Sequence, residues 1–269
     1  MQGLNHIDLI SMANNLVQKS AENLNSHHWI IPLGSPTHIV INIVFWTIFL
    51  LYLVFSGRVS EKIRMGMGQF IGILALANFA YGQLNEIDKG IWTLKLSLPL
   101  QLCSLSSLLA GYTILRGSQI GYEFLIYWGA GAIQSYVTPE ITNGEGLFNL
   151  FDYCISHGCI ILGSVYLSLR MGYKPRKGSW WKVFLYTQLV LPIIGGINWI
   201  LGANYMFLCQ KPLANNPFVM GEWPWYLLGL ELVIIVHFYV FYHLHIALSK
   251  WGNTSSTHEK PQKIYQTTH

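Results

Sequence analysis

Charged residues are what this sequence has least of. Lys, Arg, Asp and Glu make up 10% of its 269 residues, whereas soluble domains carry about 25%. The mean hydropathy is +0.38, and 52% of the residues are hydrophobic. This scarcity of charge excludes an ordinary soluble domain, and we expect an integral membrane protein of the all-α class.

Several other signals are missing. The first residues lack the basic start, apolar core and small-residue cleavage site of a secretory signal. No basic run is interleaved with aromatic residues, so nucleic acid is not an expected partner. The four cysteines have neither the paired spacing of a metal site nor the density of a disulfide framework. We therefore expect no metal and no cofactor.

Long apolar stretches are abundant. A helix needs roughly 20 mostly apolar residues to cross the hydrocarbon core, and seven stretches qualify. They cover about residues 37–56, 64–83, 97–115, 120–138, 148–170, 180–203 and 223–248. The sequence thus predicts a polytopic bundle of seven transmembrane helices.

Lys and Arg gather in alternate connections of this bundle. They follow the first, third, fifth and seventh stretches, at Arg58, Lys62, Arg64, Arg116, Arg170, Lys174, Arg176, Lys177 and Lys250. Such connections face the cytoplasm by the positive-inside rule. We expect the N-terminus outside and the C-terminus inside.

The two ends of the chain differ from the 37–248 transmembrane domain. We expect residues 1–36 to be an extracytoplasmic segment. Its apolar residues recur near helical spacing, as in an amphipathic surface helix, and a loosely ordered extension stays open as the alternative. Residues 249–269 are polar without an apolar face, so we expect a disordered cytoplasmic tail.

Polar side chains recur in the outer halves of the predicted spans. At about 1.5 Å of rise per residue they fall within a belt of roughly 5–14 Å from the outer interface. Polar groups facing lipid are unfavourable, so they normally point into a bundle or a wet cavity. Single amides also serve as interhelical hydrogen-bonding groups, but a shared depth favours a cavity. The expected substrate-binding residues are Asn42, Asn78, Gln101, Gln134, Asn198 and Asn204.

Three residues at this depth can carry chemistry. His157 exchanges protons near neutral pH. Cys103 supplies a thiol, although most intramembrane cysteines are small buried hydrophobic residues. Glu231 is a carboxylate well inside a span and needs a partner; we expect His157 or a donor from the sixth span. The sequence predicts that these three are the catalytic residues.

The sequence resembles a family of bacterial integral membrane proteins, the YwaF type, related to the eukaryotic transmembrane-protein-164 acyltransferases. The resemblance lies in "GSPTHIV", "LPLQLCSL", "AGAIQSYVTPE", "ISHGCIILGSVYLSL", "GANYMFLCQKP" and "WPWYLLGLE", spread over residues 30–248. It implies acyl transfer on phospholipids in a cell membrane, here the bacterial cytoplasmic membrane.

The family residues carry over in part. The enzymes use a cysteine in an Asn-Pro-Cys-His stretch and a histidine in a later span, and the histidine matches His157. Aligned at Pro99, the stretch has Leu100 and Gln101 where the enzymes have Cys and His. Cys103 lies one helical turn after Leu100, on nearly the same face, and we infer that it replaces the missing thiol.

Two functions stay open at this point. The first is a membrane-embedded acyltransferase that acts on phospholipid from the outer leaflet, with Cys103 activated by His157. The second is a non-catalytic protein that binds or transports a lipid or small molecule. The absent Cys and His of the family stretch favour the second; a thiol, an imidazole and a carboxylate at one depth favour the first.

Overall fold

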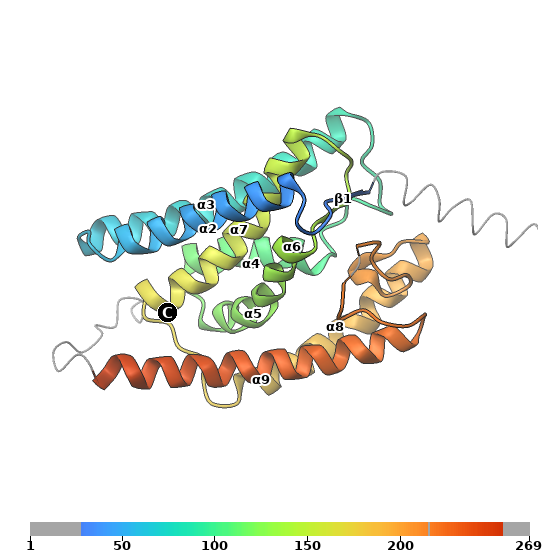
Figure 1. Cartoon of the computed structure of the whole chain (residues 1–269). Coiled ribbons are helices and arrows are strands. Elements are labelled where there is room, and N and C mark those ends of the chain that lie inside the picture. The colour runs from blue at the N-terminus through green and yellow to red at the C-terminus, as the bar shows by residue number, and fades with distance from the viewer. Residues whose placement is uncertain (1–27, 215, 255–269) are drawn as a thin grey trace, which may run out of the picture.

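The computed structural model describes residues 28–214 and 216–254, and Figure 1 shows that helices make up most of this part. Two short strands, β1 (Trp29–Ile30) and β2 (Glu140–Ile141), pair antiparallel. The helices are α2 (Pro36–Ser56), α3 (Glu61–Asp88), α4 (Leu102–Arg116), α5 (Gln119–Ala130), η1 (Gly131–Ile133), α6 (Gln134–Val137), α7 (Leu147–Arg170), α8 (Ser179–Leu201), η2 (Tyr205–Phe207) and α9 (Trp225–Thr254).

Within the described residues, five helices are long and apolar enough to cross a membrane: α2, α3, α7, α8 and α9. Many of the large apolar side chains on α2 and α9 are exposed, as Ile43 and Leu232 are, which is expected of helices that face lipid. The all-α, polytopic fold class is confirmed. The third and fourth predicted spans differ in form from the other five.

The third predicted span begins later than the sequence indicated. Hydropathy predicts a start at residue 97, but α4 begins at Leu102. Pro99 disfavours helical backbone at the residue before it, and residues 92–101 form turns. With 15 residues and about 1.5 Å of rise each, α4 is roughly 22 Å long, short of a hydrocarbon core of about 30 Å.

The fourth predicted span is broken. The α-helical hydrogen bonding of α5 stops at Ala130, a turn of 3-10 helix follows, and α6 adds four residues. Gly129 and Gly131 flank the break, and glycine disfavours regular helix. The break leaves α6 beside α2 and α7.

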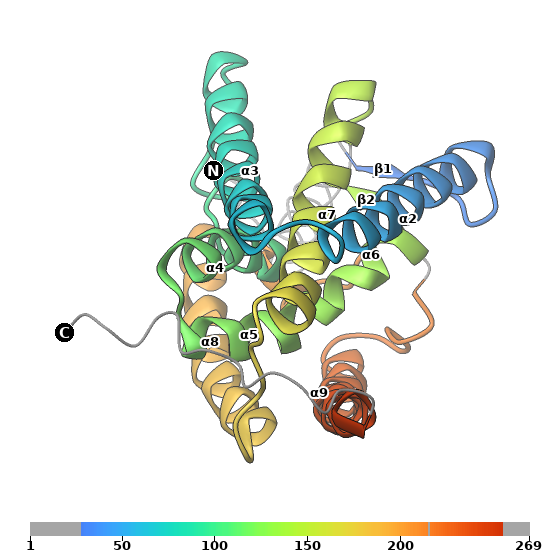
Figure 2. The same ribbon diagram turned by 90° about the vertical axis from the view of Figure 1, so that its left-hand side faces the viewer.

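α7 is the most buried of the five long helices. It packs against α2, α3, α4 and α5, and small residues allow the close approach. A Cβ added at Gly158 on α7 would lie 3.0 Å from the Phe45 ring on α2. In Figure 2, α9 lies on the side of α5 that is away from α2 and α3.

The last predicted span is longer in the structure than the sequence indicated. α9 continues to Thr254, beyond residue 248 where we expected the last span to stop. The predicted amphipathic segment falls mostly in residues 1–27, outside the described residues, as does the tail from residue 255. The β1 and β2 pairing was not predicted, because two-residue strands leave no periodic pattern.

Candidate functional site

Cys103 lies in the first turn of α4. Gln101 is the N-terminal capping position, with extended backbone at φ −70° and ψ 143°, so Cys103 is the second helical residue. The first N–H groups of a helix have no partner within the helix, and they make this end partially positive. The late start of α4 therefore places a thiol where the helix favours negative charge.

His157 lies in the middle of α7 and is 8% exposed. Its Nδ1 lies 2.8 Å from the backbone carbonyl oxygen of Tyr153, one turn earlier. A carbonyl only accepts hydrogen bonds, so Nδ1 carries the proton and donates it there. Nε2 is then left with a free lone pair, the form that a general base requires.

The Cys103 thiol lies within hydrogen-bond reach of the His157 imidazole, and the two side chains interact electrostatically. The Ser135 side chain on α6 contacts the same thiol. Three elements far apart in the sequence, α4, α6 and α7, thus meet around one sulfur atom. The expectation that Cys103 and His157 lie together rested on their matched depth, and the structure brings them together.

Further side chains hold the imidazole in place. The Tyr153 ring packs at a tilt against the His157 ring, with their centroids 4.2 Å apart. The Tyr153 hydroxyl donates to the Ser135 carbonyl at 3.0 Å. The Asp152 carboxylate interacts electrostatically with His157 and accepts a 2.9 Å hydrogen bond from Asn78 Nδ2 on α3. An imidazolium formed at His157 would have a negative charge near it.

These contacts add residues that sequence reasoning missed. Ser135 and Tyr153 were not predicted, because a serine and a tyrosine are common in membrane helices and nothing in the sequence links them to position 103. Asp152 was not among the predicted site residues either. Asn78 was expected to bind substrate, whereas here it binds Asp152.

Three of the predicted substrate-binding amides are used around η2. Asn198 donates to the Tyr205 carbonyl at 2.9 Å and accepts from its N–H at 2.8 Å. Gln101 Oε1 accepts from the Met206 N–H at 2.7 Å. Asn204 Oδ1 accepts from the N–H groups of residues 209 and 210. These bonds hold the 203–210 segment against the start of α4.

The other two amides form contacts within the helical bundle. Asn42 Nδ2 on α2 donates to the Tyr136 carbonyl on α6 at 2.9 Å, and Gln134 Nε2 donates to Thr138 Oγ1 at 2.9 Å. Neither bond involves Cys103 or His157. A single cavity lined by all the predicted polar residues stays a prediction.

The hydrogen-bond partner of Glu231 is a residue other than His157. Its Oε2 accepts a 2.7 Å hydrogen bond from Gln188 Nε2 on α8. Gln188 is the donor from the sixth predicted span that the sequence suggested as one of two partners. Among the described residues, no hydrogen bond or ion pair connects Glu231 with His157, so a role in orienting the imidazole gains no support from the geometry.

The geometry around Cys103 can be set beside known proteins. No curated protein and no solved structure matches the chain. The model of the TMEM164 family matches residues 32–242, which run from just before α2 to near the end of α9 and contain Cys103, Ser135 and His157. The chain belongs to the TMEM164 family.

Proposed function

We propose that the protein is a membrane-embedded acyltransferase that moves an acyl chain between phospholipids, with Cys103 as nucleophile and His157 as general base. The observation that carries the proposal is the contact between the thiol and an imidazole whose Nδ1 proton is held by the Tyr153 carbonyl. A thiol beside such a base is the arrangement that activates cysteine nucleophiles.

In the first half of the reaction, Cys103 Sγ attacks the carbonyl carbon of a donor ester while its proton moves to His157 Nε2. The tetrahedral intermediate then collapses. The C–O bond of the ester breaks, and the leaving alkoxide takes the proton from Nε2. The products are a thioester on Cys103 and a lysophospholipid.

The second half runs in the opposite direction with a new acceptor. A lysophospholipid hydroxyl gives its proton to His157 Nε2 and attacks the thioester carbonyl. The C–S bond breaks, and Cys103 recovers a proton from the imidazolium. The Asp152 charge stabilises the imidazolium in both halves.

The oxyanion of each intermediate needs hydrogen-bond donors. The backbone N–H groups of residues 102–104 fit this role, because they are in the unpaired first turn of α4 beside the nucleophile. The side-chain amides of Asn198 and Gln134, which the sequence predicts to bind substrate, already donate to Tyr205 and Thr138.

Site access from the outer leaflet belongs to the same proposal. With the basic connections in the cytoplasm, the N-terminal ends of α4 and α7 face outward, and Cys103 and His157 lie in the outer halves of their helices. The acyl chains of a phospholipid would then approach from the outer half of the bilayer.

The experiment measures transfer of a fluorescent acyl chain between phospholipids by the purified full chain in lipid nanodiscs. Cys103→Ser and His157→Ala are each expected to lower turnover at least about 100-fold, the contribution typical of a nucleophile or general base. Cys154→Ser is the matched control, since this thiol on α7 is partly buried against the core as Cys103 is but has no contact with His157 among those described.

Two results would contradict the proposal. Turnover at the wild-type level by Cys103→Ser would exclude a thioester intermediate. Absence of any turnover by wild type, with phospholipid still bound, would favour the second candidate, a lipid carrier. That candidate draws on one observation, namely Leu100 and Gln101 at the positions of the family Cys and His.

A further inference from the structure

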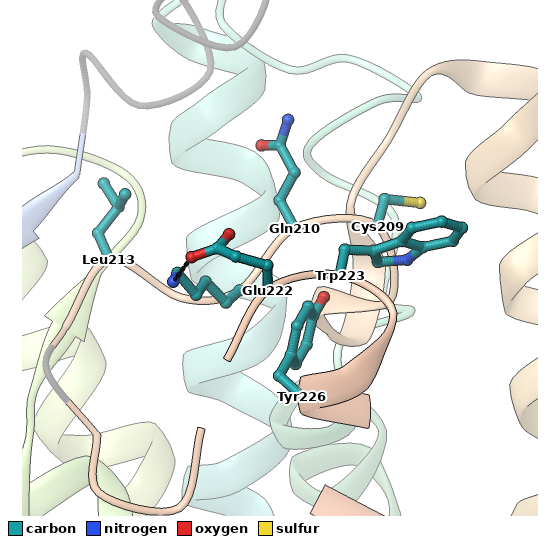
Figure 3. Close-up of a pocket in the computed structure, with 7 residues that line it drawn as sticks. Cys209, Gln210, Leu213, Glu222, Trp223 and Tyr226 are labelled. Carbon is teal, nitrogen blue, oxygen red and sulfur yellow. Dashed lines mark hydrogen bonds and ion pairs between the residues drawn. The ribbon is translucent and has the colours of Figure 1, made fainter. Parts of the chain in front are cut away.

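A pocket of about 320 Å³ lies apart from Cys103 and His157. Its walls are residues 209–213 of the connection after α8 and residues 222–226 at the start of α9, as Figure 3 shows. It is at the lower end of the range of small-molecule sites. Its size suits a polar headgroup better than a whole lipid.

Opposite charges lie side by side in this pocket. Lys211 Nζ is 2.7 Å from Glu222 Oε1 (Figure 3), and the two side chains are 43% and 83% exposed. An exposed ion pair contributes little net free energy. A ligand that carries both a negative and a positive group can therefore insert between the two side chains and replace each partner.

Aromatic rings complete the walls. The indole N–H of Trp223 donates to the Leu208 carbonyl at 3.1 Å, and the Tyr226 hydroxyl donates to the Phe207 carbonyl. Tyr226 is fully buried, whereas Trp223 is 60% exposed and offers a ligand its ring surface. The face of an aromatic ring, and that of tryptophan most strongly, attracts an ammonium group.

The pocket lies at the end of two membrane-crossing helices, α8 and α9. Large apolar side chains that adjoin the lining residues in the chain are exposed: Trp225 by 67% and Met220 by 75%. Tryptophan collects where a membrane meets water, at the level of the lipid headgroups. The ligands most concentrated at this depth are the headgroups themselves.

We propose that this pocket binds the zwitterionic headgroup of a phospholipid, with the phosphate on Lys211 and the ammonium between Glu222 and Trp223. The inference rests on the proposed function and assigns a headgroup class to its substrate. The connection that lines the pocket also contacts the residue before α4, through the 2.7 Å bond from the Met206 N–H to Gln101 Oε1.

The test titrates the detergent-solubilised full chain with dioleoylphosphatidylethanolamine, which is zwitterionic, and with dioleoylphosphatidylglycerol, which is anionic, and measures bound lipid by native mass spectrometry. Wild type is expected to bind the zwitterionic lipid about tenfold more tightly. Lys211→Gln and Glu222→Gln should each remove this preference. Glu145→Gln, an exposed carboxylate in the connection before α7, is the matched control and should keep it.

The exchanged variant, Lys211→Glu with Glu222→Lys, separates ligand binding from structure. It keeps an ion pair but reverses its direction, so it should fold and lose the preference. Equal affinity of wild type for the two lipids, or an unchanged preference in the exchanged variant, would overturn the proposal.

The two proposals can fail separately. Cys103→Ser should keep the headgroup preference, since that residue is outside the pocket. A headgroup preference without any acyl transfer by wild type would support the headgroup pocket and contradict the acyltransferase function. Acyl transfer at a rate that depends neither on the headgroup nor on substitution of Lys211 or Glu222 would support the acyltransferase function and contradict the headgroup pocket.

Discussion

Glu231 and Gln188 form a hydrogen bond between two membrane-crossing helices, at 2.7 Å. Removing one partner leaves the other without its hydrogen bond in partly buried surroundings, which typically costs about 1–3 kcal/mol. We expect Glu231→Ala to lower the thermal midpoint of unfolding, measured by intrinsic fluorescence in detergent. The free energy of unfolding should fall by an amount in that range.

A double variant controls for this effect. Glu231→Leu with Gln188→Leu replaces both polar groups by apolar ones, and such replacements are often nearly neutral. The double variant should therefore unfold closer to wild type than Glu231→Ala does. If it also transfers acyl chains at the wild-type rate, Glu231 has no part in catalysis, contrary to the expectation from the sequence.

At the scale of single residues, the sequence could predict depth but not partners. Counting along the spans put Cys103 and His157 at one level, because helix rise per residue is constant. It could not reveal that Asn198 bonds to Tyr205 or that Asn78 bonds to Asp152. Those partners depend on helix rotation and on the path of the connections, which hydropathy does not record.

Helix contacts depend on glycine at the interface of α3 and α4. A Cβ added at Gly111 on α4 would lie 2.3 Å from Leu76 Cγ on α3. We expect Gly111→Ala to force these helices apart and to destabilise the protein by about 1–3 kcal/mol, as overpacking usually does. Thermal unfolding in detergent measures the effect.

Gly66→Ala is the matched control, since a Cβ at that helical position of α3 would meet nothing within 4 Å. It should be neutral or slightly stabilising, because alanine favours helix over glycine. An equal loss of stability in the two variants would show that the contact with Leu76 does not decide the outcome.

Glu140 joins three segments at one end of the bundle. Its Oε1 lies 2.7 Å from His28 Nδ1 beside β1, and its Oε2 accepts from the Ala214 N–H at 2.8 Å. Burial raises the pKa of this carboxyl, but the hydrogen bonds from His28 and the backbone outweigh it, and the pKa lies below its ordinary value. The carboxylate therefore stabilises the folded state.

This stabilisation should depend on pH in a defined direction. It is fully present above the unfolded pKa of about 4.3 and is lost as the pH falls through the lower folded value. The difference in thermal midpoint between wild type and Glu140→Gln should therefore shrink below about pH 4. A difference in thermal midpoint that stays constant from neutral to acidic pH would show that the stabilisation by Glu140 does not depend on its negative charge.

At the scale of elements, hydropathy found the five long helices and missed the form of two others. It counts apolar residues but does not distinguish a straight helix from turns that are covered by protein. Pro99 and the glycines at 129 and 131 were visible in the sequence as helix-disfavouring residues. Where α4 starts and α5 breaks depends on the packing of η2 and α7 around them.

The whole molecule has one end rich in cations. Arg58, Arg64, Arg170 and Arg176 lie in or beside the connections from α2 to α3 and from α7 to α8. Arg170 Nη2 donates to the Leu53 carbonyl at the end of α2, and Arg176 forms an ion pair with the buried Glu123. Part of the positive charge therefore stabilises the fold, in addition to its expected effect on the orientation of the chain in the membrane.

The expected orientation can be tested with a thiol that is already present. Cys209 is the exposed cysteine, whereas Cys159 is buried and the other two are partly buried. Partial burial raises the pKa of the Cys209 thiol, so labelling should be carried out at about pH 8 or above, where more thiolate forms. If the cationic end faces the cytoplasm, a membrane-impermeant maleimide added to intact cells should label wild type and not Cys209→Ser. Labelling of wild type only after the membrane is permeabilised would reverse the orientation. In that case, the Cys103 site and the headgroup pocket would draw their lipid from the inner leaflet.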